Sequence, residues 1–323
     1  MATGNGSGWQ VHHWTHRFFT ITTITTGAGE FALQNFQYAA PTTVDDAIQA
    51  LSEHGEQAKM LAGGTDIIVQ LREGMCEADA VIDIKRIEEL MQLEYSSRVG
   101  LQLGAGVPCW KIYQHAELSV AYPALVDATR IIGGWQIQSR ASVGGNLCNA
   151  SPAADTIPTL IAHNAVCHIA GPQGRRSLPV EQFCAAPGRN ILQPGEILVA
   201  LTFPPPLPKA SSAYERFIPR NEMDIAAAGA ASWVQLDDTG ERIVKARIAL
   251  GAVAPTPIFA QEASSWLVGQ PVNDETFVEA GEIAKKVASP IDDMRGTREY
   301  RVHLVGVLTK RTLAKATHRA QAE

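Results

Sequence analysis

Two pairs of adjacent glycines, each expected to precede a helix start, constrain the fold of this 323-residue chain more than any other feature. The first pair lies in AGGTD at residues 62–66, and the second lies in SVGGN at residues 142–146. Glycine has no Cβ, so the main chain can turn sharply there and approach a ligand closely. Successive N–H groups in such turns point donors at an anion. We therefore expect two tight turns that can each bind a phosphate without a lysine.

Strand-like and helix-like patterns alternate around both turns. Apolar residues recur at helical spacing over residues 44–54, and an apolar strand is expected to run to Ala62. A short helix follows it and is stopped by Gly74. After the second turn, Ser151 can cap a helix that has Asp155 in its first turn. This alternation predicts an α/β or α+β layer arrangement.

A proline-rich stretch at 204–212 predicts a domain boundary. The part beyond it contains a hairpin signal at Asp238-Thr239-Gly240 and two helical patterns near the C-terminus, which indicate a small sheet with helices packed on it. Residues 1–30 are rich in Thr and Gly and are expected to be a disordered extension. The predicted organisation is therefore 1–30 as extension, 31–207 and 208–316 as domains, and 317–323 as a tail.

Composition and missing motifs exclude several classes of protein. The net charge of −6 argues against a nucleic-acid partner. No apolar stretch reaches the roughly 20 residues that a membrane span needs. The five cysteines form no C-x-x-C pair, so we expect no metal or iron–sulfur site and a reducing compartment, the cytoplasm. P-loop and hydrolase signatures are missing. The Rossmann signature is missing as well, because the G-x-G at Gly104 and Gly106 lacks the third glycine.

The two glycine turns together can hold the two phosphates of a dinucleotide. Ser142 and Asn146 would add side-chain hydrogen bonds to the main-chain donors of the second turn. Either glycine pair alone commonly makes only a turn. The two pairs together, with Asp155 beyond the second, favour a diphosphate ligand.

Seven motifs in order carry a resemblance to a known family. The chain resembles the FAD-binding medium subunit of molybdenum hydroxylases, the family that contains carbon monoxide dehydrogenase and the xanthine dehydrogenases. The motifs are AGGTDIIVQLREG, VIDIKRIEEL, ASVGGNLCNASPAAD, PGEILVAL, RNEMDIAAAGAA, GAVAPTP and YRVHLVGVLTKR, from about Phe31 to Lys315. The resemblance implies an α+β fold. Its FAD-binding domain would have two subdomains of the vanillyl-alcohol-oxidase (PCMH) type, followed by a C-terminal three-stranded antiparallel sheet with helices.

The resemblance also implies which residues contact FAD. They come from both glycine turns and from separate positions further along the chain, and they include no catalytic residue and no metal ligand. The implied residues are Met60, Leu61, Ala62, Gly63, Gly64, Thr65, Asp66, Ile67, Ile132, Ser142, Val143, Gly144, Gly145, Asn146, Asp155, Leu198 and Arg216. Arg216 stands where some relatives have Lys, so the charge is kept with a different geometry. Valine at Gly64 or Gly144 is expected to abolish FAD binding while the fold stays largely intact.

The resemblance implies an oxidoreductase subunit that transfers electrons. A separate molybdopterin-binding large subunit would hydroxylate the substrate, and a [2Fe-2S] small subunit would pass electrons to FAD here. FAD would pass them to an external acceptor such as NAD, oxygen or quinone. One alternative is a self-contained FAD-dependent reductase of the cell-wall precursor type, which shares the FAD fold. Another is an interaction subunit that has lost FAD, and the intact glycine pairs argue against it.

Overall fold

The computed structural model describes residues 11–15, 18–21, 35–220 and 222–322. Its α-helices are α1 (Val44–His54), α2 (Ile67–Arg72), α3 (Glu88–Met91), α4 (Cys109–Gln114), α5 (Ala116–Ala121), α6 (Pro123–Thr129), α7 (Trp135–Gln138), α8 (Val143–Asn149), α9 (Thr156–Ala162), α10 (Gln261–Trp266), α11 (Asp274–Lys285) and α12 (Arg298–Ala322). Short 3-10 helices are η1 (Gly55–Gln57), η2 (Ile84–Arg86) and η3 (Val180–Gln182). The strands are β1 (Val11–Thr15), β2 (Phe18–Ile21), β3 (Phe36–Ala39), β4 (Ala58–Leu61), β5 (Ala80–Asp83), β6 (Leu93–Ser96), β7 (Gly100–Gly104), β8 (Val166–Gly171), β9 (Gly174–Pro179), β10 (Cys184–Ala186), β11 (Arg189–Asn190), β12 (Ile197–Phe203), β13 (Ala210–Phe217), β14 (Ala228–Leu236), β15 (Ile243–Gly251) and β16 (Ile258–Phe259).

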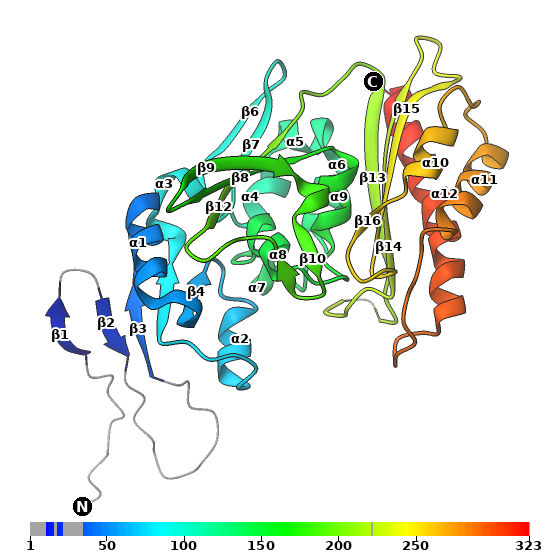
Figure 1. Ribbon diagram of the computed structural model, residues 1–323. Coiled ribbons are helices and arrows are strands. Elements are labelled where there is room, and N and C mark those ends of the chain that lie inside the picture. Colours follow the sequence, from blue (N-terminus) through cyan, green and yellow to red (C-terminus); the bar gives the residue numbers. More distant parts are fainter. Residues whose placement is uncertain (1–10, 16–17, 22–34, 221, 323) are drawn as a thin grey trace, which may run out of the picture.

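A small sheet in the order β1-β2-β3-β5-β4 forms the first layer (Figure 1). Its strands β3, β5 and β4 are parallel. Helix α1 begins where the Thr43 hydroxyl accepts the Asp46 N–H at 3.1 Å, and it ends at Gly55 in the left-handed region. The buried side of α1, with Ala47 and Leu51, packs toward this sheet. The expected helix over 44–54 is therefore present with the same bounds.

Strands β1 and β2 lie inside the segment 1–30, which the sequence predicts to be disordered. Strand β2 pairs antiparallel with β3, and β1 pairs antiparallel with β2. For these two stretches the structure differs from the prediction, because β-branched and aromatic residues follow one another there beside an open edge of β3. The remainder of segment 1–30 lies outside the described residues.

A second, antiparallel sheet in the order β6-β7-β12-β8-β9 forms the centre of the molecule. Strand β12 is its middle strand, and its run ILVALTF is almost entirely buried, as expected for a strand covered on both faces. Helices α4, α5, α6, α8 and α9 cover one face. The core between them includes Leu103, Leu147, Leu160 and Leu201.

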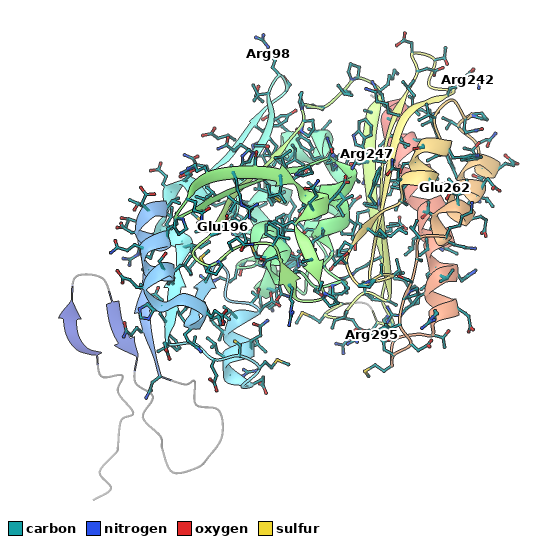
Figure 2. The ribbon with its side chains drawn as sticks, in the orientation of Figure 1. Arg98, Glu196, Arg242, Arg247, Glu262 and Arg295 are labelled. Atoms are coloured by element: carbon teal, nitrogen blue, oxygen red, sulfur yellow. The ribbon has the colours of Figure 1, made fainter. Side chains whose placement is uncertain are left out.

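The C-terminal sheet, β13-β14-β15-β16, stands between the central helices and helices α10–α12 (Figure 1). Three long strands match the expected three-stranded sheet, and the two-residue β16 extends it. Arg247 on β15 donates to the Ile161 carbonyl of α9 at 3.0 and 3.1 Å, and Figure 2 labels it where the sheet meets the central layer. The other face of the sheet packs on α11 and α12.

Helix α12 continues through the predicted tail 317–323 as far as Ala322. Thr317 and Ala320 are buried, and Arg319 donates to both carboxylate oxygens of Asp127 on α6 at 2.8 and 2.9 Å. These contacts stabilise the part of α12 that lies beyond residue 316. Among the described residues, no helix combines the length and the apolarity that crossing a bilayer requires.

Candidate cofactor-binding site

The first glycine turn links β4 to α2 and depends on glycine at both positions. Gly64 has a φ of 80°, in the left-handed region that favours glycine. Gly63 packs directly on the chain before the second turn, because a Cβ there would lie 2.1 Å from the Arg140 carbonyl oxygen. The two turns, about 80 residues apart in sequence, therefore touch through their main chains.

The predicted tight turn at 142–146 is wrong in its local form, because Ser142 is the N-cap of α8 and residues 143–146 form the first turn of that helix. Residues 142–146 are still called the second turn below. The Ser142 hydroxyl accepts the Gly145 N–H at 3.0 Å and caps the helix. The Asn146 side-chain oxygen accepts the Thr156 hydroxyl at 2.6 Å. A Cβ on Gly144 would lie 2.5 Å from the Ala105 carbonyl oxygen. Gly144 is therefore required by helix–strand packing, and valine there would damage the fold, contrary to the expected effect on FAD alone.

The two turns present main-chain donors that have no partner within the described part of the chain. No hydrogen bond is made by the N–H groups of Gly63, Gly64, Thr65 and Asp66. The same holds for Gly144 in the first turn of α8, where N–H groups lack intrahelical acceptors. Gly64 and Gly144 are buried, and buried N–H groups are almost always paired, so these two donors favour an acceptor from a ligand.

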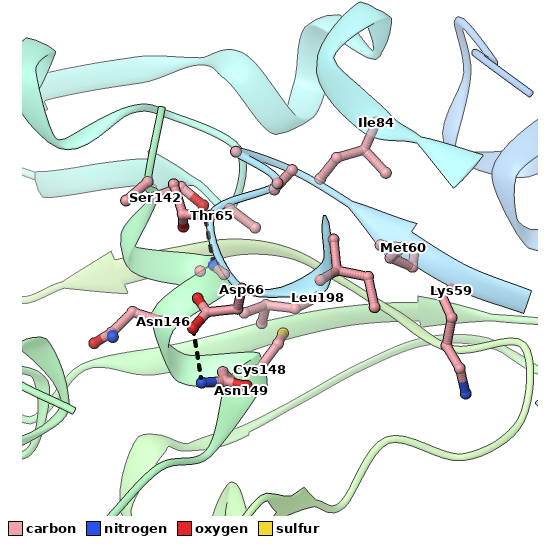
Figure 3. Close-up of a pocket in the computed structure, with 18 of the residues that line it drawn as sticks. Lys59, Met60, Thr65, Asp66, Ile84, Ser142, Asn146, Cys148, Asn149 and Leu198 are labelled. Carbon is pink, nitrogen blue, oxygen red and sulfur yellow. Dashed lines mark hydrogen bonds between the residues drawn. The ribbon is translucent and has the colours of Figure 1, made fainter. Parts of the chain in front are cut away.

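Both turns line one cavity of about 660 Å³, a size typical of cofactor sites. Figure 3 shows Thr65 and Asp66 of the first turn and Ser142 and Asn146 of the second around it. Its walls combine donors with apolar side chains such as Leu198. The predicted residues that line it are Met60, Ala62, Gly63, Gly64, Thr65, Asp66, Ile67, Ile132, Ser142, Gly144, Gly145, Asn146 and Leu198. The structure therefore brings most of the predicted residues to one place.

Four predicted residues do not line this cavity: Leu61, Val143, Asp155 and Arg216. Leu61 packs beside an N-terminal apolar cluster and Val143 packs in the central core, because their side chains turn toward those cores. Asp155 and Arg216 instead pair with each other.

Asp155 and Arg216 form a buried ion pair between α9 and β13. Their N–O distance is 2.5 Å, and their side chains are only 9% and 7% exposed. The Tyr214 hydroxyl donates to the other oxygen of Asp155 at 2.8 Å. Burial raises the pKa of Asp155 to about 6, while Arg216 and Tyr214 act to lower it, so the carboxylate is charged at neutral pH.

The cavity is also lined by residues that the sequence analysis did not single out. Asn149 donates to Asp66 at 3.4 Å and accepts from Gln70 at 3.4 Å, which joins α8 to α2 (Figure 3). Burial raises the pKa of Asp66. The remaining unpredicted lining residues are Ala58, Lys59, Ile84, Ala105, Ile137, Ala141, Cys148, Gly188, Asn190, Leu192 and Glu196.

For some of these lining residues the sequence contains a local pattern that places them beside the glycine turns, and for others it does not. Asn149 follows Asn146 by three positions and so lies on the same face of α8, and Gln70 follows Asp66 by four positions in the same way. Gly188 and Asn190 belong to the β10–β11 hairpin, and Glu196 follows it. Nothing near them in the sequence indicates that this hairpin reaches the glycine turns.

Comparison with protein families matches two parts of the chain. Residues 34–206 match the FAD binding domain in molybdopterin dehydrogenase, and residues 212–316 match the CO dehydrogenase flavoprotein C-terminal domain. The chain is 32% identical over 280 residues to a xanthine dehydrogenase FAD-binding subunit of Escherichia coli, covering 86% of this chain and 95% of the relative. It is 29% identical to the carbon monoxide dehydrogenase medium chain of Afipia carboxidovorans, covering 89% and 98%.

Solved structures give the same result. A chain of carbon monoxide dehydrogenase from Hydrogenophaga pseudoflava superposes with a TM-score of 0.84 at 29% identity, covering 88% of this chain and 98% of that one.

Proposed function

Because the chain belongs to the FAD-binding subunits of molybdenum hydroxylases, we propose that it transfers electrons from a [2Fe-2S] subunit through FAD to an external acceptor. A separate molybdopterin-binding subunit would oxidise the substrate. The names of the relatives support partner subunits, since they are chains or subunits of dehydrogenases. The acceptor would be NAD, oxygen or quinone. The five cysteines form no disulfide within the described residues, which supports our proposal of a reducing compartment, the cytoplasm.

One observation carries the assignment of the site: the two glycine turns meet at one cavity, and five of the residues that line it, Gly63, Gly64, Thr65, Asp66 and Gly144, have N–H groups without a partner within the described residues. Neutral main-chain donors suit a diphosphate, which needs several acceptor oxygens satisfied at once. We therefore propose that the predicted residues lining the cavity contact FAD, with its diphosphate between the turns. Asp155 and Arg216 would support this region from behind the cavity wall.

Within this proposal the chain binds, orients and shields the cofactor. FAD, when bound, exchanges electrons in pairs or singly, which couples a two-electron reaction to one-electron centres. No acid–base residue of this chain is required for that role. The apolar residues Ile132, Ile137 and Leu198 of the cavity wall would exclude water from the flavin ring.

We propose the domain division 31–207 and 208–316, since Pro204, Pro205 and Pro206 follow β12 and precede β13. The matches to the FAD binding domain in molybdopterin dehydrogenase and to the CO dehydrogenase flavoprotein C-terminal domain argue against the self-contained cell-wall precursor reductase.

Gly145→Val tests the site. A Cβ on Gly145 would lie 3.0 Å from the Ser142 hydroxyl and 3.9 Å from the Ala62 side chain, so the valine methyl groups would occupy the space between the turns. We expect the purified parent to carry FAD, seen as the visible absorbance of oxidised flavin, and the variant to lose it while its thermal unfolding in the flavin-free form stays close to that of the parent.

Gly296→Val is the matched control, because Gly296 lies in a loop that does not line the cavity, and it should keep its FAD. A Gly145→Val protein with the FAD content of the parent would refute the proposed site. A chain that alone turns over a nucleotide sugar would favour the reductase alternative.

A further inference from the structure

Two cationic side chains bind the carbonyl groups of the first glycine turn from outside the cavity. Lys85 donates its ammonium to the Ala62 carbonyl at 3.1 Å, and Arg140 donates its Nε–H to the Gly63 carbonyl at 3.4 Å. Ala62 and Gly63 line the cavity, whereas Lys85 and Arg140 do not. These two consecutive carbonyl groups therefore point away from the cavity.

The orientation of these carbonyls determines where the following N–H groups point. In a trans peptide the C=O and the N–H of the next residue lie in one plane and point in opposite directions. Anchoring the Ala62 and Gly63 carbonyls on the outer side therefore turns the Gly63 and Gly64 N–H groups toward the cavity. These are two of the donors that have no partner within the described residues.

Lys85 is itself held in place by a network from two strands. It pairs with Asp83 at 2.7 Å, and the Tyr38 hydroxyl of β3 donates to the other Asp83 oxygen at 2.6 Å. Burial acts to raise the pKa of Asp83, but the hydrogen bonds from Lys85 and Tyr38 lower it overall. Burial and Asp83 raise the pKa of Tyr38 to about 12. At neutral pH Asp83 is therefore an anion that fixes the Lys85 cation.

We propose that Lys85 and Arg140 are positioning residues for the FAD diphosphate. They hold the two peptide groups of the turn so that neutral N–H donors face the phosphates, and they place positive charge behind the turn without direct contact with the cofactor. Lys85 has the larger role, since its side chain is 27% exposed and anchored, whereas Arg140 is exposed and its hydrogen bond is longer. This inference depends on the proposed location of the diphosphate between the turns.

Binding of three probes to the flavin-free full-length chain tests the inference. FAD and ADP contain the diphosphate, and riboflavin does not. In Lys85→Met we expect the dissociation constants for FAD and ADP to rise about tenfold, the usual effect of losing a charge-assisted hydrogen bond. Affinity for riboflavin should stay unchanged, and Lys85→Arg should restore much of the FAD affinity, because it keeps a cationic donor.

Two further variants complete the design. Arg140→Met should weaken FAD and ADP by about threefold, because the interaction is exposed. Arg86→Met removes an exposed neighbouring cation that donates to neither carbonyl, and should change affinity less than about twofold. Because Arg140 is exposed, Arg140→Met should fold, and its FAD affinity still tests the inference if Lys85→Met does not fold.

The outcomes separate this inference from the proposed site. Unchanged FAD binding in Lys85→Met and Arg140→Met would overturn the inference. An affinity for riboflavin that falls as much as the affinity for FAD would also overturn it, because it indicates a purely structural role. If Gly145→Val loses FAD while both cation variants bind it normally, only the positioning role fails. If Gly145→Val retains FAD, the proposed site itself fails.

Discussion

At the scale of single residues, the clearest change from expectation concerns Asp155 and Arg216. The family resemblance treats each as a separate FAD contact, whereas the structure pairs them in a nearly dry position beside Tyr214. A buried pair depends on both partners, because removal of one leaves an uncompensated charge.

We expect Arg216→Met to lower the free energy of unfolding by about 3 kcal/mol near neutral pH, because it leaves the buried Asp155 carboxylate without its cation. Urea unfolding measures the loss. Without Arg216, burial holds the pKa of Asp155 further above its unfolded value, so the folded variant takes up a proton more readily than the unfolded chain. The deficit should therefore shrink as the pH falls from about 8 to about 5.

The double variant Asp155→Asn with Arg216→Met is the control, since it removes both charges. It should recover much of the lost stability and show no such pH dependence. A deficit that is the same at both pH values and persists in the double variant would contradict the ion-pair explanation.

At the scale of elements, one histidine joins helices α6 and α9 of the central layer to strand β13 of the C-terminal sheet. His163 ends α9, and its Nε2 lies 3.0 Å from the Ser212 hydroxyl of β13, which in turn accepts the Ala124 N–H of α6 at 3.1 Å. The ring also packs edge-on against Tyr122 and Phe203. This packing leaves no solvent for a charged ring, and burial, with the nearby Arg247 charge, lowers the pKa of His163 to about 3.

The free energy of unfolding of His163→Gln should fall less steeply than that of the parent as the pH drops below 6.5. Below the ordinary histidine pKa the unfolded chain binds a proton at this position and the folded chain does not, so stability is lost as the pH falls from 6.5 toward about 3. The slope of the free energy of unfolding should differ between parent and variant by about 1.4 kcal/mol per pH unit inside this window. Urea unfolding over a pH series measures it, and parallel profiles would refute the assignment.

At the scale of the whole molecule, the C-terminal helix connects the C-terminal sheet to the central layer. Residues 298–316 pack on the sheet, as the pattern predicted, and the last turns extend far enough for Arg319 to reach Asp127 on α6. Asp127 also accepts the Tyr214 N–H of β13 at 3.2 Å. One carboxylate therefore links α6, β13 and α12.

Removal of residues 317–323 should lower the midpoint of thermal unfolding by about 5 °C, because it removes a partly buried ion pair and apolar contacts. Calorimetry or circular dichroism measures the shift. Lys310→Met is the control on the same helix, since its pair with Asp274 is exposed and should contribute little. An unchanged midpoint after truncation would mean that the last turns of α12 do not anchor the domains.

The sequence predicts the tight turn at 62–66, because a glycine pair between a strand and a helix has a local backbone cause. At 142–146 the structure has the N-terminus of α8 in place of the predicted tight turn, although these residues still line the cavity. Leu61 and Val143 were included with their neighbours, although their side chains face the cores. The β10–β11 hairpin, with Gly188 and Asn190, was missed because only packing brings it to the cavity.

The amino-acid sequence by itself determined the alternation of strands and helices and the tight turn at 62–66, because periodicity and the absence of a Cβ act on neighbouring residues. Only the tertiary structure decided that the turns touch, that Lys85 and Arg140 bind the carbonyls of one of them, and that Asp155 pairs with Arg216. These contacts join residues between 23 and 77 positions apart, and Asp155 and Arg216 are 61 apart. Their geometry depends on how the sheets and helices pack, which no local pattern specifies.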